Sequence, residues 1–212
     1  MKTKKKSLLA LILVLVMVLL SGCGGWSTDD AKAYTQALLD AQYKGEFKDY
    51  MKLTDSTEKE AQKMYESSLD DELAALGIDE STLSAEMIEN YRNLCLDMKK
   101  NVDYKVGKAK EAEDDSFTVD VKVKPLIFED KSDEIVNMVQ EEYANLAEVP
   151  SEEEVMAMFY GKLYEVLSDK VANPSYGEEK SVTLHVKKNK DGVYYIPDEE
   201  LETLSESAIA AE

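Results

Sequence analysis

Histidine, cysteine, glycine and proline are scarce in this sequence of 212 residues. It contains one histidine, His185, and two cysteines, Cys23 and Cys95, with nine glycines and four prolines. One histidine cannot supply several imidazole ligands, so multi-histidine zinc sites are excluded. Because few glycines and prolines interrupt the chain, long helices are favoured. P-loop, G-x-S-x-G and G-x-G-x-x-G motifs are absent, so no motif indicates a nucleotide-binding protein or an α/β-hydrolase.

Positive charge is also in short supply. The chain has 44 acidic and 25 basic residues, a formal net charge of −19, and residues 23–212 alone carry −23. A protein this negative repels phosphate backbones, which excludes nucleic acid as a partner. An EF-hand loop centred on Gly192 would need an acid where Lys187 stands. We therefore expect the acidic runs to be solvated turns and helix starts, with no bound metal or cofactor; they lie at 70–72, 113–115, 152–154 and 198–200.

The N-terminus has the pattern of a secretory signal. Lysines at positions 2 and 4–6 precede an apolar run of 13 residues, Leu8 to Leu20, which is shorter than the roughly 20 residues of a membrane-spanning helix. The next residues, Leu20-Ser21-Gly22-Cys23, resemble the lipobox of bacterial lipoproteins. The resemblance implies cleavage after residue 22 and a diacylglycerol thioether on Cys23. Two acyl chains suffice for stable anchoring.

The predicted organisation follows from this signal. Residues 1–22 are the lipoprotein signal peptide, 23–28 the lipidated cysteine and a short tether, and 29–212 a single α+β domain. The expected location is the extracytoplasmic face of the cell membrane. Lipidation of Cys23 leaves Cys95 alone, so no intramolecular disulfide can form. Because Cys95 falls on the apolar stripe of a predicted helix, we expect a buried structural thiol.

Hydrophobic periodicity predicts the secondary structure. Apolar residues at helical spacing predict helices over 29–43, 47–51, 57–76, 81–100, 132–146 and 151–172, with a short helix from 198. Two of these begin with capping-box spacing, at Thr57/Glu60 and Ser151/Glu154. Alternating apolar residues predict strands at 102–106, 117–123, 182–186 and 193–195. The first two and the last two of these strands form hairpins. Two hairpins favour a four-stranded antiparallel sheet with helices packed on one face.

Three segments carry a resemblance to a known family: Tyr43-Lys44-Gly45-Glu46-Phe47-Lys48-Asp49-Tyr50, Leu53-Thr54-Asp55-Ser56-Thr57 and Asp191-Gly192-Val193-Tyr194-Tyr195-Ile196. They are similar to an uncharacterised family of Gram-positive lipoproteins that carries a domain of unknown function with a cystatin-like or NTF2-like fold. The resemblance spans about residues 27–205. It implies the architecture and supplies no catalytic residues. Sheets of NTF2-like folds often enclose a pocket, and fold alone does not define function.

No residue pattern predicts a catalytic site. His185 is expected on the polar face of its strand, where it would be solvated. Methionines after the signal, together with many tyrosines, could fill the core or line an apolar pocket. We therefore expect a non-enzymatic module that binds a small apolar ligand or an envelope protein. The alternatives are an envelope enzyme using carboxylates or tyrosines in a sheet-lined cavity, and an accessory subunit of an envelope complex.

Overall fold

A four-stranded antiparallel sheet organises the fold in a computed structural model that describes residues 25–67, 69–78 and 83–211. The strand order is β1-β2-β4-β5, and Val119 of β2 lies opposite Leu184 of β4. The predicted α+β class with two hairpins is therefore confirmed. The strands are β1 (Asp103–Glu111), β2 (Phe117–Lys124), β4 (Lys180–Lys188) and β5 (Tyr194–Tyr195).

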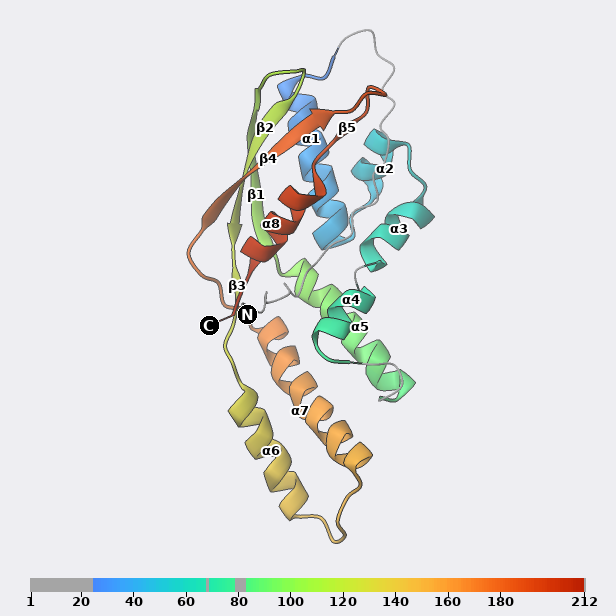
Figure 1. The fold of residues 1–212 in the computed structure, drawn as a ribbon, viewed down its shortest axis with the longest axis vertical. Helices are drawn as coiled ribbons and strands as arrows, with labels where there is room; N and C mark the ends of the chain where they lie inside the picture. The colour runs from blue at the N-terminus through green and yellow to red at the C-terminus, as the bar shows by residue number, and fades with distance from the viewer. Residues whose placement is uncertain (1–24, 68, 79–82, 212) are drawn as a thin grey trace, which may run out of the picture.

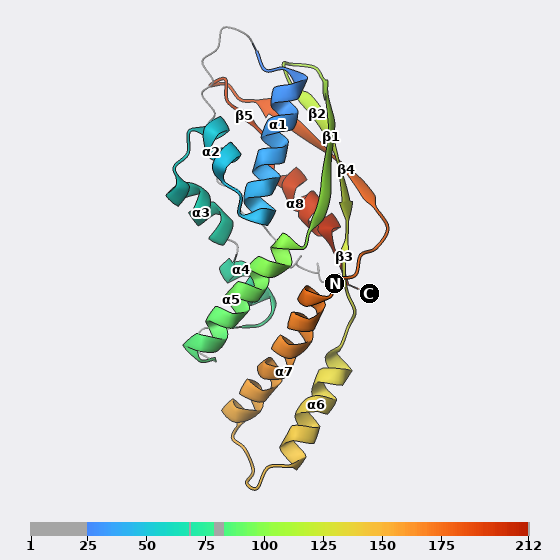
Figure 2. The same cartoon turned by 180° about the vertical axis from the view of Figure 1, so that it is seen from behind.

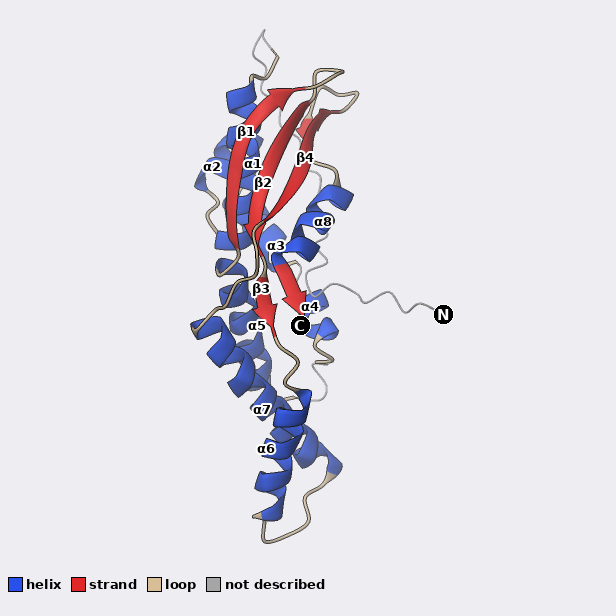
Figure 3. Cartoon of the chain, turned by 90° about the vertical axis from the view of Figure 1, so that its left-hand side faces the viewer, coloured by secondary structure: helices blue, strands red, loops and turns tan. Residues whose placement is uncertain are grey.

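One face of the sheet is apolar and carries the helices. Strand β2 alternates buried and more exposed residues, with Val119, Val121 and Val123 at most 1% exposed. Helices α1 (Thr28–Leu39) and α8 (Asp198–Ala208) pack on this face. In the described part of the chain, no helix covers the opposite face of β1, β2 and β4, which is turned to the viewer in Figure 3. The helices therefore lie on one face, as the alternation predicts.

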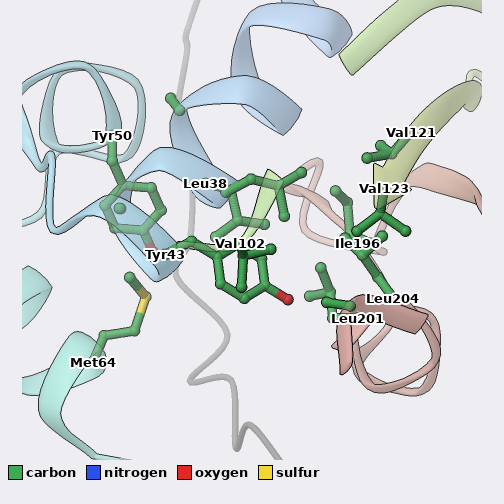
Figure 4. Close-up of a cluster of buried hydrophobic side chains, with 14 of the residues drawn as sticks. Leu38, Tyr43, Tyr50, Met64, Val102, Val121, Val123, Ile196, Leu201 and Leu204 are labelled. Carbon is green, nitrogen blue, oxygen red and sulfur yellow. The ribbon is translucent and has the colours of Figure 1, made fainter. Parts of the chain in front are cut away.

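The main core lies between this sheet and its two helices (Figure 4). Leu38 of α1 and Leu201 and Leu204 of α8 are at most 1% exposed. The Tyr43 hydroxyl lies 2.9 Å from the Ser205 hydroxyl and joins the end of the first helix to α8. This apolar burial is the main favourable term in holding both helices on the sheet.

Four further elements continue the helical layer: the π-helical turn η1 (Asp40–Lys44), α2 (Lys48–Thr54), α3 (Glu58–Glu66) and α4 (Leu69–Ala75). The capping box of Thr57 and Glu60 opens α3 as predicted. The helix predicted over 57–76 is wrong in its continuity, because it is divided into α3 and α4. The helix predicted over 29–43 is likewise wrong in its last turn, where η1 replaces regular α-helix and Gly45 ends it with φ +67°.

Helix α5 (Ala85–Lys100) leads from this layer into β1. Its N-cap is Ser84, whose hydroxyl accepts a hydrogen bond from the Met87 N–H. Ser81, at the start of the helix predicted over 81–100, lies outside the described residues, and α5 begins at Ala85, later than expected. Both serines precede an apolar helical pattern, so spacing alone does not choose between them.

A second, two-stranded sheet was not predicted. Strand β3 (Leu126–Phe128) pairs in parallel with β6 (Ile209–Ala211) at the C-terminal end of α8. Three-residue strands are too short to show an alternating pattern, and their partner is about 80 residues away in sequence. The pairing of these two segments depends on the tertiary fold, which brings them side by side.

An antiparallel helix pair projects from the body and gives the molecule its elongated shape (Figure 1). We call residues 132–172 the arm: α6 (Ser132–Ala144), the loop 145–151, and α7 (Glu152–Ala172). The capping box of Ser151 and Glu154 opens α7, as predicted. The loop end of the arm lies at the opposite end of the molecule from residues 25–27, where the described chain begins, as the reverse view in Figure 2 also shows.

Candidate functional site

The arm is the least covered part of the described structure. Along residues 132–172, only Ile135 and Tyr160 are buried. Tyr160 holds the arm to the body, because its hydroxyl donates to the Gly77 carbonyl at 2.6 Å and its carbonyl accepts from the Tyr91 hydroxyl at 2.7 Å. Helix α6 packs mainly on α7, and α7 also packs on α5 and on the core of the body.

Large apolar side chains are exposed on the arm. Of the six exposed large apolar residues described, five belong to it, and Val149 at its tip is 83% exposed. We call these five the arm patch: Val136, Tyr143, Leu146, Val149 and Met156. Tyr143 and Leu146 lie on the apolar face of the helix that periodicity predicts over 132–146. The structure leaves both side chains uncovered, and exposed apolar residues that gather on one segment are typical of an interaction surface.

A groove of about 470 Å³ runs between α6 and α7 beside this patch and shares Leu146 with it. We call it the arm groove; it is lined by Glu142, Leu146, Pro150, Glu154, Ala157, Met158, Gly161, Lys162 and Glu165. The two smallest side chains, Ala157 and Gly161, are four residues apart and therefore on one face of α7. The Lys162 ammonium lies 3.1 Å from a Glu142 carboxylate oxygen and 3.3 Å from one of Glu165. These hydrogen bonds, first that with Glu142, raise the pKa of Lys162.

Gly161 has no internal packing role that requires a glycine. A Cβ atom built there would meet no described atom within 4 Å, apart from its own helix. We expect Gly161→Ala to raise the free energy of unfolding by about 0.5–1 kcal/mol, because alanine loses less backbone entropy in a helix. Urea denaturation followed by circular dichroism would measure this change. An equal or lower midpoint would contradict the open environment described for this position.

A separate apolar cavity of about 100 Å³ lies where the arm meets the body. We call it the junction cavity; it is lined by Leu76, Leu94, Cys95, Met98, Phe128, Leu167, Val171 and Ile209. It lies between α5, α7 and the two-stranded sheet rather than on the face of the four-stranded sheet. Of the methionines, Met64 and Met98 are buried and Met156 is exposed on the arm. Methionine therefore occurs both in the core and on the surface.

Cys95 is a buried thiol, as predicted. Burial, with a smaller effect of Glu72, raises the pKa of the Cys95 thiol to about 12, so it stays protonated and weakly nucleophilic at neutral pH. Beside it, the Lys99 ammonium lies 3.3 Å from a Glu72 carboxylate oxygen and donates to the Tyr65 carbonyl at 2.9 Å. Both charged side chains are 1% exposed. The sequence does not predict this ion pair. Lys99 follows Cys95 by four residues on the same helix face, which indicates that Lys99 is buried but does not name its partner.

His185 has a specific partner, which corrects the expectation of a merely solvated residue. Its Nδ1 lies 3.0 Å from Glu200 Oε1, and its backbone N–H donates to Glu200 Oε2 at 2.6 Å. Glu200 of α8 thereby satisfies a backbone donor of β4. This contact has a structural explanation, because a backbone N–H of a strand that is shielded from water without a hydrogen-bond partner is costly. Among the residues that the structure describes, no group of three or more His, Cys, Asp or Glu side chains is placed to hold a metal ion.

One tyrosine–carboxylate contact bears on the enzyme alternative. The Tyr104 hydroxyl donates to Asp40, which also accepts from the Gln36 amide at 2.8 Å. Burial and the hydrogen bond to Asp40 raise the pKa of Tyr104, so the phenol stays neutral. A neutral phenol whose proton is already committed to a carboxylate has a structural role between the first helix and β1.

The N-terminal end of the described chain is fastened to the body. The Trp26 indole stacks on the Tyr194 ring, with ring centroids 4.1 Å apart, and meets Tyr34 edge-on at 5.3 Å. Residues 1–22 and Cys23 lie outside the described residues. Cys23 precedes Trp26 by three positions, and three residues of extended chain span at most about 11 Å. A group attached to Cys23 is therefore confined to the end of the molecule where Trp26 lies.

Each helix in the described part of the chain is too short or too polar to span a bilayer.

Comparisons with known proteins bear on the fold. No family model and no curated protein matches this chain. The chain is similar to the crystal structure of a presumed lipoprotein, ycdA, from Bacillus subtilis subsp. subtilis str. 168, with a TM-score of 0.62 and 23% sequence identity. The match covers 85% of this chain and 56% of that one, so this chain spans little more than half the length of its structural neighbour. The two proteins share a fold.

Proposed function

We propose that this protein is a lipid-anchored protein of the extracytoplasmic membrane face that acts without catalysis and binds a partner protein through its arm. The observation that carries the proposal is the exposure of the arm patch, above all Val149 at the tip. An apolar surface of this kind is costly in water unless another surface covers it for part of the time. The lipoprotein signal, with Cys23 as the lipidated residue, supports the anchored location.

The position of the arm supports a protein partner rather than lipid. The tether after Cys23 is short, and the Trp26 stack holds its end on the body, so the anchored end faces the bilayer. The arm tip lies at the opposite end of the molecule (Figure 1). Its apolar residues therefore lie far from the membrane to which the protein is attached, where a second envelope protein can reach them.

The structural likeness agrees with this proposal at the level of fold, since the neighbour is itself described as a lipoprotein. Two other roles stay predictions. A small apolar molecule would fit the junction cavity, because apolar cavities stay dry and accept such ligands. An envelope enzyme would need carboxylates or tyrosines that converge on a substrate. The role of accessory subunit in an envelope complex is compatible with a docking arm. The cystatin-like or NTF2-like assignment also stays a prediction.

Acidic substitutions on the arm patch test the docking function. We expect the double variant Leu146→Asp/Val149→Asp to lose a partner that the wild-type protein retains after cross-linking in its own host, with at least about a tenfold reduction in recovery. Both residues are exposed, so the fold is not the target. Ala112→Asp, an exposed apolar-to-acidic change in the β1–β2 turn, is the matched control and should retain the partner.

Quantitative mass spectrometry of the cross-linked material measures this difference. The docking function is contradicted if every protein retained by the wild type is retained equally by the arm double variant. Circular dichroism and thermal unfolding of the purified variants would show that each one keeps its fold.

A further inference from the structure

Resting on the proposed docking function, we propose that the partner presents a basic amphipathic helix and that this helix lies in the arm groove. The inference names the kind of segment that fits the groove between α6 and α7. It follows from the shape of the groove, from its charge, and from its distance from the anchored end.

The shape of the groove favours a helix. The junction of α6 and α7 forms an open groove, and a third helix packs into such a furrow by ridges-into-grooves geometry. Ala157 and Gly161 form the shallowest part of the α7 wall, one helical turn apart. With nothing over Gly161, the backbone of an incoming helix can approach α7 closely at this point. Leu146 and Met158 then offer apolar contacts to its buried stripe.

The charge of the groove selects a basic partner. Residues 132–166 contain nine carboxylates and one lysine, a net charge of −8. That lysine, Lys162, is engaged by Glu142 and Glu165 of the groove itself. Three carboxylates, those of Glu142, Glu154 and Glu165, line the groove with one lysine, so the groove walls keep a net charge of −2 for lysine or arginine residues beside an apolar stripe to meet. Complementary charge of this kind speeds association and disfavours partners of the same sign.

The same charges argue against the other possible occupants. A second copy of this chain would bring two surfaces of −8 together, which is electrostatically unfavourable. An anionic bilayer would repel the arm for the same reason. The bilayer to which the protein is attached also lies at the other end of the molecule. A basic helix on another protein meets both the apolar and the charged features of the groove.

Three synthetic helical peptides test the inference against the purified domain. One has a leucine stripe flanked by lysines, one has the same stripe flanked by glutamates, and one keeps the lysines with serine in place of leucine. We expect the leucine–lysine peptide to bind at least about tenfold more tightly than either of the others in isothermal titration calorimetry. Its affinity should fall as the salt concentration rises, because the charged contacts are exposed.

A groove-filling variant separates docking from general attraction to an acidic protein. Gly161→Leu places a bulky side chain in the groove without changing the net charge. We expect it to weaken binding of the leucine–lysine peptide by about tenfold or more, as blocking the centre of an interface does. Ala33→Leu adds a similar bulk at an exposed position of α1 and should leave the affinity unchanged.

Equal affinity of that peptide for the wild type and Gly161→Leu would overturn the proposed groove site. Equal binding of the leucine–glutamate peptide would overturn the charge argument. If no peptide binds while the arm double variant still loses its partner in cells, the docking function stands and the basic helix is ruled out. If the arm variant loses nothing and the peptide still binds in the groove, the docking function fails while the chemistry of the groove holds.

Discussion

Replacing Lys99 with alanine is expected to lower the free energy of unfolding by about 3–5 kcal/mol. Lys99 and Glu72 are an almost fully buried ion pair, and the ammonium also donates to the Tyr65 carbonyl. Removal of the lysine takes the Lys99 charge away from the buried Glu72 carboxylate, and it leaves a cavity in place of a long side chain. Chemical denaturation at neutral pH would measure the loss.

An exposed ion pair provides the comparison. Lys100 and Asp97 lie 2.8 Å apart on the outer side of the same helix, with both side chains more than half exposed. We expect Lys100→Ala to change stability by less than about 1 kcal/mol, because water screens such pairs. The double variant Glu72→Leu/Lys99→Met should recover much of the loss, because apolar side chains can replace a buried pair. A loss below about 1 kcal/mol for Lys99→Ala would contradict the buried pairing.

Replacing Cys23 with alanine is expected to release the protein from membranes or to leave its signal uncleaved, and in either case to abolish incorporation of labelled fatty acid. A diacylglycerol group provides two acyl chains, and each buried methylene contributes about 0.8 kcal/mol to membrane binding. If the signal is still cleaved from this variant, only a strongly acidic domain remains to associate with the bilayer, and anionic lipids repel it. Fractionation of host cells and metabolic labelling would measure both effects.

The second cysteine is a matched control for this experiment. Cys95 is buried and its thiol stays protonated, so Cys95→Ala should leave both lipid labelling and the membrane fraction unchanged. Labelling that persists in Cys23→Ala would refute the assignment of the lipidation site. Labelling that disappears only in Cys95→Ala would show that Cys95, and not Cys23, carries the acyl group.

Local features of the fold could be predicted from sequence because each depends on residues close together in the chain. The capping boxes at Thr57 and Ser151 need only a serine or threonine followed three residues later by glutamate. The alternation from Phe117 to Val123 likewise marks β2 and its buried face. The division of the predicted helix 57–76 was not foreseen, because its apolar spacing continues across both pieces.

Features of the candidate site could be predicted only in part. Periodicity correctly found α6 and α7, and it marked Tyr143 and Leu146 as apolar-face residues. It could not show whether the chain itself covers that face, because coverage depends on where the two helices stand relative to the body. The same limit explains why periodicity could not separate core methionines from the exposed Met156, and why it did not indicate the groove at Gly161.

The sequence by itself determined the acidic charge, the lipoprotein-like N-terminus, the helix caps and the strand faces, because these are properties of single residues or of neighbours within one turn. Only the tertiary structure decided that β3 pairs with β6, that Lys99 meets Glu72, and that the arm leaves apolar residues uncovered at the end opposite Trp26. These contacts join segments far apart in the chain, and their energy depends on burial and distance, which no local spacing encodes.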